Sequence, residues 1–215
     1  MPALMNVFEN PVSVPDTVQG GVVALGNFDG VHRGHQAVIG EALTHGRKVG
    51  RPVGVMTFDP HPRKFFQPNA TMFTLTPTSQ KIRLFNALGC DFAGVLTFDA
   101  AMASLTGEAF VRDVLHAIWR VDHVVVGYNF FFGKGRSGSP QQLVELGEEL
   151  GFDVTVMAPV SDDGEVFSSS AVRNYLRAGD VRGGADMLGH WWTVAGTVES
   201  GAGIGTGMGY PTANV

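Results

Sequence analysis

Short apolar runs alternate with amphipathic stretches along most of this 215-residue chain. The runs have the length of buried strands, and the stretches between them have helical spacing. Alternation of this kind predicts an α/β fold with a doubly wound parallel sheet, whose ligands bind at the carboxyl ends of the strands. The expected strands are Val22–Leu25, Val53–Phe58, Phe92–Phe98, His123–Gly127 and Val154–Pro159, and the expected helices are Gly34–Arg47, Ser79–Leu88, Gly107–Arg120, Pro140–Leu150 and Ser170–Leu188.

The pattern changes near Gly189. Residues Trp192 to Glu199 have the composition of a β-strand, and glycine occupies every second position from Gly201 to Gly209. One strand and a loop cannot build a core of their own. We therefore predict two units: a domain over residues 1–188, and the incomplete beginning of a second, β-rich domain over residues 189–215.

Composition narrows the class of protein. With 44% apolar and 16% charged residues the chain is globular, and a formal charge of −5 argues against a nonspecific nucleic-acid binder. The apolar runs are strand-length and the first residues lack the pattern of a signal peptide, so we expect no membrane association and a cytoplasmic location. The single cysteine, Cys90, is expected to pack in the core.

The first candidate site follows the first predicted strand. Gly26-Asn27-Phe28-Asp29-Gly30-Val31-His32-Arg33-Gly34-His35 joins that strand to a helix. A glycine-rich turn at a helix N-terminus offers free N–H groups and a positive dipole end to an anion. His32, Arg33 and His35 stand where the dipole favours acidic residues, which indicates a phosphate ligand. The alternative is a tight turn with exposed or hydrogen-bonded histidines.

A second candidate site is Ser168-Ser169-Ser170-Ala171-Val172-Arg173. Serine is a good N-cap, but a capping box would place Glu or Gln where Arg173 stands. Hydroxyls, N–H groups and a guanidinium at a second helix start suit a triphosphate. A plain serine cap beside a solvated arginine is the alternative.

Two loops after other predicted strands complete the candidate pocket. Gly127 to Gly138 holds three consecutive aromatics between glycines, followed by basic residues, and predicts either core packing or one wall of a pocket for a planar ring. Thr57 to Phe66 is stiffened by two prolines and carries Arg63 and Lys64, so it is either a binding loop or a rigid turn with solvated charges.

Other signatures are missing from the sequence. The spacing from Gly127 to Gly133 is one residue too long for a P-loop, and Gly135 replaces its Ser or Thr. The glycines from 201 to 209 do not form GxGxxG, no Cys/His set has zinc spacing, and no GxSxG is present. A nicotinamide dinucleotide site, a structural zinc and a hydrolase nucleophile are therefore not expected.

At these residues the chain resembles the prokaryotic bifunctional riboflavin kinase/FAD synthetase family of the HxGH nucleotidylyltransferase superfamily. Gly26–His35 is similar to its first adenylyltransferase motif, Thr57–Pro62 to its TF[DE]PHP segment, Gly127–Gly138 to its flavin-side loop and Ser168–Arg173 to its SSTxxR-type motif. Tyr210–Asn214 resembles the PTAN signature that opens the kinase domain. The resemblance implies a Rossmann-like nucleotidylyltransferase fold, followed by the start of a β-barrel-type domain.

The resemblance further implies that residues 1 to about 188 transfer AMP from ATP to FMN, giving FAD and pyrophosphate. We expect the kinase barrel to lie beyond Val215, so this chain should not phosphorylate riboflavin. Our hypothesis assigns His32 and His35 to the α-phosphate and Arg173 to the β- and γ-phosphates as catalytic groups, with Mg²⁺ bridging the triphosphate and no protein ligand assigned to it. The expected ATP-binding residues are Gly26, Asn27, Phe28, Asp29, Gly34, Ser168, Ser169 and Ser170; the flavin-binding residues are Phe58, His61, Pro62, Asn129, Phe130 and Phe132; and the kinase-domain remnant holds Thr212 and Asn214.

The chain departs from the family pattern at three positions. Ser170 stands where threonine is usual, Phe131 where arginine is common, and Thr206 where arginine often precedes PTAN. Two alternative functions remain. One is nucleotidylyl transfer to another phosphorylated acceptor, and the other is a catalytically silent flavin- or nucleotide-binding module.

Overall fold

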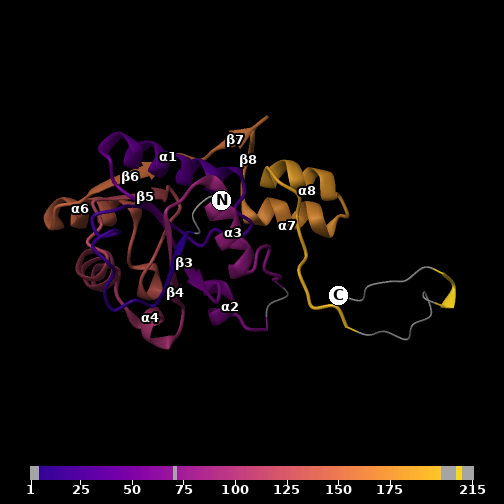
Figure 1. Ribbon diagram of the computed structural model, residues 1–215, viewed down its shortest axis with the longest axis horizontal. Coiled ribbons are helices and arrows are strands. Elements are labelled where there is room, and N and C mark those ends of the chain that lie inside the picture. Colours follow the sequence, from indigo (N-terminus) through magenta and orange to yellow (C-terminus); the bar gives the residue numbers. More distant parts are fainter. Residues whose placement is uncertain (1–4, 70–71, 200–206, 210–215) are drawn as a thin grey trace.

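In the computed structural model, which describes residues 5–69, 72–199 and 207–209, the centre of the molecule is a six-stranded sheet. The strands follow the order β1-β4-β3-β2-β5-β6, and every neighbouring pair is parallel (Figure 1). The predicted doubly wound parallel sheet is confirmed. Its strands are β1 Asn6–Glu9, β2 Val22–Leu25, β3 Val53–Asp59, β4 Phe92–Thr97, β5 His123–Gly127 and β6 Asp153–Met157.

The two faces of the sheet belong to two separate hydrophobic cores. In β2, Val22 and Ala24 join a core with Ile39 and Phe85, whereas Val23 and Leu25 join the opposite core, which contains Trp119. Because successive strand residues point to opposite faces, β2 is buried at all four positions and reads as a continuous apolar run. Cys90 packs in the first of these cores, as expected, and burial raises the pKa of its thiol to about 12.

Helices cover both faces of the sheet. Helices α1 and α3 supply the core on one face, while η1, a π-helix, and α6 supply the other. Helices α7 and α8 pack against each other beside the sheet over a small third core (Figure 1). The bounds are α1 Arg33–Val49, α2 Pro62–Phe66, α3 Thr78–Leu88, α4 Ala100–Ser104, α5 Gly107–Ala109, η1 Phe110–Ile118, α6 Pro140–Leu150, α7 Ser169–Arg177 and α8 Val181–Leu188, with a short 3₁₀ turn η2 at Lys134–Arg136 and a hairpin of β7 Ser161–Asp162 and β8 Glu165–Val166.

The structure corrects two predicted helices. The single helix expected over Ser170–Leu188 is two helices, because Gly179 takes a left-handed φ of 79° and the Asp180 side chain then caps α8. The helix expected over Gly107–Arg120 starts as α5 and continues as the wider η1 turns. Strand β1 was not predicted, because it is a short, mostly exposed strand at the edge of the sheet.

The strand predicted over Trp192–Glu199 is wrong for residues 192–198, which lie in no strand or helix. Among the described residues no strand lies beside this segment to complete a ladder, and Trp191 and Val194 are exposed. The alternating glycines up to residue 206, Thr206 itself, Thr212 and Asn214 lie outside the described residues. Over residues 5–69, 72–199 and 207–209, no helix combines the length and the apolar character needed to cross a membrane.

Candidate active site

The order of the sheet places its topological switch point beside β2. The chain proceeds from β2 to β3 and β4 on one side, whereas β5 and β6 lie on the other. Ligands of open α/β sheets bind outside the carboxyl ends of the strands at such a point. A cavity of about 560 Å³ lies there, and its lining includes residues that follow β2, β3 and β5 together with the first residues of α7.

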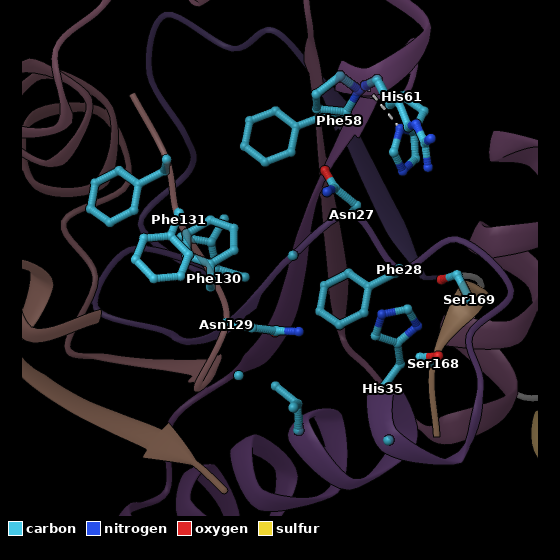
Figure 2. Close-up of a pocket in the computed structure, with 18 of the residues that line it drawn as sticks. Asn27, Phe28, His35, Phe58, His61, Asn129, Phe130, Phe131, Ser168 and Ser169 are labelled. Atoms are coloured by element: carbon cyan, nitrogen blue, oxygen red, sulfur yellow. Dashed lines mark hydrogen bonds between the residues drawn. The ribbon is translucent and has the colours of Figure 1, made fainter. Parts of the chain in front are cut away.

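The cavity has two chemically different walls. Figure 2 shows the rings of Phe58, Phe130 and Phe131 gathered on one side, and His35 with Ser168 and Ser169 on the other. The side chains of Asn27 and Asn129 lie between the two groups (Figure 2). One end of the cavity therefore suits a planar apolar group, and the other suits a polar or anionic one. Most residues predicted for the site line it: Gly26, Asn27, Phe28, His32, Gly34, His35, Phe58, His61, Pro62, Asn129, Phe130, Phe132, Ser168, Ser169 and Ser170.

The β2–α1 turn presents two stacked imidazoles to this cavity. His32 is the N-cap of α1, and its Nδ1 accepts a hydrogen bond of 3.3 Å from the N–H of His35. The two rings stack with centroids 3.6 Å apart. A Cβ on Gly34 would lie 3.2 Å from the His32 ring and 3.3 Å from the Phe167 carbonyl, so glycine lets the turn approach the start of α7 without displacing either neighbour.

Burial keeps both imidazoles neutral near pH 7. It lowers the pKa of His32 to about 4, and it lowers that of His35 well below 6.5; the charge of Lys81, and repulsion from His32 and His61 whenever those rings are protonated, lower the pKa of His35 further. The two histidines can therefore offer hydrogen bonds to a phosphate without carrying a fixed charge. The buried Nδ1 of His35 has no hydrogen-bond partner. Arg33, also expected at the anion site, does not line the cavity and approaches Asp162 at 3.8 Å.

The backbone of the turn is held in an unusual conformation. Phe28 and Val31 have positive φ angles of 49° and 42°, which cost non-glycine residues about 1–3 kcal/mol each. Hydrogen bonds from several distant segments hold it there, so contacts within the protein itself fix this conformation. All five carbonyls from Asn27 to Val31 are used: Thr57 and Lys81 donate to Asn27, the Val31 N–H to Phe28, the Ser169 hydroxyl to Asp29, the His190 ring to Gly30 and the Gln36 amide to Val31.

The three serines at the start of α7 have different contacts. The Ser168 hydroxyl caps the helix by accepting from the Ala171 N–H at 3.1 Å. The Ser169 hydroxyl donates to the Asp29 carbonyl at 2.8 Å, which joins α7 to the β2–α1 turn. Ser170 is exposed and lines the cavity, so its hydroxyl is available to a ligand.

Arg173 and Asp29 occupy a different place from the one their sequence motifs suggested. Arg173 is only 5% exposed; its guanidinium pairs with the Asp29 carboxylate and donates to the carbonyls of Phe73 at 2.9 Å and Ser169 at 3.2 Å. The second Asp29 oxygen accepts from the backbone N–H of Leu75 and Thr76. Neither side chain lines the main cavity. Together they connect the turn, α7 and the 72–77 loop.

The aromatic wall combines core and pocket functions. Phe132 is 7% exposed and packs on Phe110, while Phe130 stacks on Phe132 with centroids 5.4 Å apart. Phe131 is 46% exposed, and the Arg136 guanidinium lies 4.9 Å from its ring centroid. Both predictions for this loop therefore apply: Phe132 packs in the core, and Phe130 and Phe131 line the cavity. On the opposite edge His61 caps α2, its Nδ1 accepting from the Arg63 N–H at 3.1 Å.

Sequence reasoning missed several residues that line the cavity. They come from the end of β4, from α4 and η1, and from the segment before α7: Phe98, Met102, Leu105, Phe110, Pro159, Val160 and Phe167. Phe98 ends a predicted strand, so the rule that ligands lie at carboxyl ends would have found it. The same rule points to Pro159, which ends the strand predicted over Val154–Pro159, and Phe110 lies in a predicted helix. The remaining residues had no signal, because α4 is too short for a helical period and the segment at 160–167 carries no motif.

A smaller cavity of about 270 Å³ adjoins the first one. Its lining includes Asp29, Asp59, Lys64 and Lys81, and it shares His61 with the main cavity. No group of three or more His, Cys, Asp or Glu side chains suited to a metal ion occurs over residues 5–69, 72–199 and 207–209.

The fold and the cavity define an α/β protein whose cavity, at the switch point of a parallel sheet, has an aromatic wall at one end and a polar wall at the other. Residues 14–171 match the family model of FAD synthetase, and residues 188–215 match that of riboflavin kinase. The chain belongs to the FAD synthetase family.

Known proteins show the same relationship. The bifunctional riboflavin kinase/FMN adenylyltransferase of Escherichia coli (strain K12) is 38% identical over 197 residues, which are 92% of this chain and 63% of that protein. The protein of the same name from Listeria monocytogenes is 35% identical, with 90% of this chain and 62% of that protein covered. The chain thus spans less than two thirds of the length of these relatives.

Solved structures confirm the fold. A crystal structure described as a macrolide-efflux protein from Streptococcus pneumoniae superposes with a TM-score of 0.83 at 27% identity, covering 98% of this chain and 68% of that chain. A pantoate-β-alanine ligase from Francisella tularensis superposes with a TM-score of 0.50 at 14% identity, covering 85% of this chain and 86% of that chain, which shows a likeness of fold alone.

Proposed function

We propose that residues 1–188 form an FMN adenylyltransferase domain that transfers AMP from ATP to FMN. A phosphate oxygen of FMN attacks the α-phosphorus of ATP, the bond from that phosphorus to the β-phosphate bridge breaks, and FAD and pyrophosphate leave. The observation that carries this proposal is the two-walled cavity, with an aromatic wall at one end and two helix N-termini at the other. The names of the relatives point to the same reaction.

The reaction needs positioning more than acid–base help. The phosphate of FMN is ionised near neutral pH and attacks without a general base, so geometry and charge stabilisation dominate. We assign His32 and His35 to the α-phosphate, where their neutral rings would donate hydrogen bonds as negative charge grows. Gly26, Asn27 and Phe28 would contact adenosine.

The flavin ring would lie against the aromatic wall. Phe58, Phe130 and the exposed Phe131 give that wall its apolar surface, and Asn129 supplies a polar group beside it. His61 and Pro62 would close the far edge. The Arg136 guanidinium above Phe131 adds positive charge to the same wall, which suits a ligand that carries a phosphate on its ring side.

Arg173 takes a supporting role in this proposal. Its burial against Asp29 favours a brace beneath the triphosphate, and direct contact with the β- and γ-phosphates falls instead to the α7 N-terminus and the Ser170 hydroxyl. Mg²⁺ would arrive as the ATP complex, because it prefers substrate phosphates and water to dedicated protein cages. When bound it would neutralise charge on the triphosphate. Residues 189–215 are proposed to begin a riboflavin kinase domain, which their family match supports.

The test is an assay of the 215-residue chain with ATP, FMN and Mg²⁺, scored for FAD and pyrophosphate. Nicotinamide mononucleotide, phosphopantetheine and riboflavin replace FMN in parallel reactions. Among these acceptors we expect only FMN to give a dinucleotide product, which is FAD. In His32→Ala we expect the rate of FAD formation to fall about 100-fold or more, as it does when one oxyanion donor is removed. Binding of FMN or ATP without turnover would indicate a silent binding module. Unchanged pyrophosphate release in His32→Ala would refute the role of the imidazole.

A further inference from the structure

Lys81 is a buried lysine beneath the candidate active site. It lies on α3, is 5% exposed, and does not line the main cavity. Its Nζ donates to the Thr57 hydroxyl at 3.0 Å, to the Phe58 carbonyl at 3.2 Å and to the Asn27 carbonyl at 3.4 Å. Three acceptors match the three N–H donors of an ammonium group, so the three bonds favour the charged form of the lysine.

The position of these acceptors explains what the ammonium group does. The ladder between β2 and β3 ends where the Gly26 N–H donates to the Met56 carbonyl at 3.1 Å. Beyond that bond the two chains diverge around the cavity, and the carbonyls of Asn27 and Phe58 lose their strand partners. Lys81 bonds to both, and the Thr57 hydroxyl also donates to the Asn27 carbonyl at 3.0 Å. The lysine thus joins the start of the β2–α1 turn to the end of β3, where the aromatic wall begins.

A buried ammonium is costly unless its surroundings compensate for the loss of water. Burial lowers the pKa of Lys81, and the carboxylates of Asp59 and Asp29 oppose that effect. Asp29 also forms the ion pair with Arg173. A leucine or methionine would fill the same space without the cost of removing an ammonium group from water. We infer that the hydrogen bonds of the charged group, and not packing alone, explain a lysine at this position.

We propose that Lys81 is a positioning residue of the adenylyl-transfer site, which fixes the Asn27–His35 turn and the Phe58–Pro62 loop at the separation that ATP and its acceptor require. This inference rests on the proposed function. Without the ammonium group the turn, which contains two residues at positive φ, loses a bond at its first carbonyl and shifts relative to β3. Positional errors of about 1 Å at such sites reduce rates by up to about 100-fold.

The experiment compares Lys81→Met with Lys48→Met in the 215-residue chain. Methionine has a similar length and no donor, and Lys48 is an exposed lysine in the last turn of α1. We expect kcat/KM for ATP to fall about 10- to 100-fold in Lys81→Met, mainly through kcat, and to stay within about twofold in Lys48→Met. Rates are normalised to folded protein by the near-ultraviolet circular dichroism signal. Normalised constants within twofold of wild type in Lys81→Met would overturn the proposal.

Two further measurements separate positioning from mere stabilisation. Burial is the main cause of the lowered pKa of His35, and the nearby charge of Lys81 lowers it further, so an NMR titration of ¹⁵N-labelled histidines should show that pKa rising in Lys81→Met. An unchanged His35 titration would contradict the proposed geometry. If Lys81→Met does not fold, Thr57→Val decides: it removes the hydroxyl that accepts from the ammonium and donates to Asn27, and it leaves only the direct Lys81–Asn27 bond of 3.4 Å between them. It must then lower kcat/KM for ATP, by less than Lys81→Met would, whereas wild-type constants would overturn the proposal. If the wild-type chain forms no FAD, the proposed function fails, but the titration still tests Lys81.

Discussion

At the scale of single residues, the site depends on side chains that folding keeps uncharged. His32 has a pKa of about 4 in the folded protein, against about 6.5 when exposed in the unfolded chain, because burial penalises the imidazolium. Between about pH 6.5 and pH 4, His32 is protonated in the unfolded chain but stays neutral in the folded protein. The stabilisation from this residue is therefore complete above pH 6.5 and is lost as the pH falls towards 4.

We predict that His32 alone accounts for about 2 kcal/mol of the stability lost between pH 7 and pH 5, given about 1.4 kcal/mol per pKa unit. His32→Asn is the informative variant, because asparagine still caps α1 but does not titrate. Urea unfolding at the two pH values should show a smaller loss in His32→Asn than in the wild type. Equal losses in the two proteins would mean that His32 is exposed enough to protonate freely.

Arg173 and Asp29 form a buried ion pair whose partners are 144 positions apart in the sequence. Removing one partner of such a pair leaves a buried charge, which typically costs about 3–5 kcal/mol. We therefore expect Arg173→Met to lower the free energy of unfolding by that amount, and Asp29→Asn/Arg173→Met to be less destabilised than the sum of the single variants. Chemical denaturation of the four proteins measures this coupling. A rise in KM for ATP without loss of stability in Arg173→Met would instead place the guanidinium on the triphosphate.

At the scale of elements, the sequence pattern predicted those strands and helices whose buried residues recur in a regular pattern. β2 and β5 were predicted with their observed bounds, because strands covered on both faces read as unbroken apolar runs. Elements α2 and α4 are each five residues long and leave no periodic trace. The site residues were predicted as a set because they follow strands. The sequence could not predict the pairing of Arg173 with Asp29 or the neutrality of the histidines, since both depend on tertiary contacts and burial.

The break between α7 and α8 gives the prediction that belongs to this scale. The Asp180 carboxylate accepts from the Gly183 N–H at 2.8 Å and caps α8, which carries the buried Met187 and Leu188. Asp180→Ala should lower the free energy of unfolding by about 1 kcal/mol, the usual cost of a lost N-cap. The matched control is Asp186→Ala, an exposed residue of the same helix, for which a change within about 0.5 kcal/mol is expected. Thermal or urea unfolding of both variants distinguishes the cap from a general effect of charge.

At the scale of the whole molecule, the segment after α8 is tied to the candidate active site. The FAD synthetase match ends at residue 171 and the riboflavin kinase match begins at residue 188, yet the His190 ring bonds to the Gly30 carbonyl at 3.0 Å and the Trp192 indole N–H donates to the Leu75 carbonyl at 2.9 Å. The Gln36 side chain, in α1, also donates to the Leu188 carbonyl at 2.8 Å. The first residues of the riboflavin kinase match thus hold the strained turn that carries the histidines.

This arrangement predicts that a residue outside the FAD synthetase match affects kcat/KM for ATP. In His190→Ala the Gly30 carbonyl loses its partner, which should cost about 1–2 kcal/mol of stability and loosen the turn, so that kcat/KM for ATP falls about 3- to 10-fold. Thr193→Ala is the control, because Thr193 is exposed and its hydroxyl reaches only the neighbouring Trp191 carbonyl, at 3.4 Å. Steady-state kinetics and urea unfolding measure both effects. Loss of stability with unchanged ATP kinetics would show that the segment braces the fold and leaves the geometry of the turn intact. A fall in both would mean that the start of one unit sets the shape of the other unit's site.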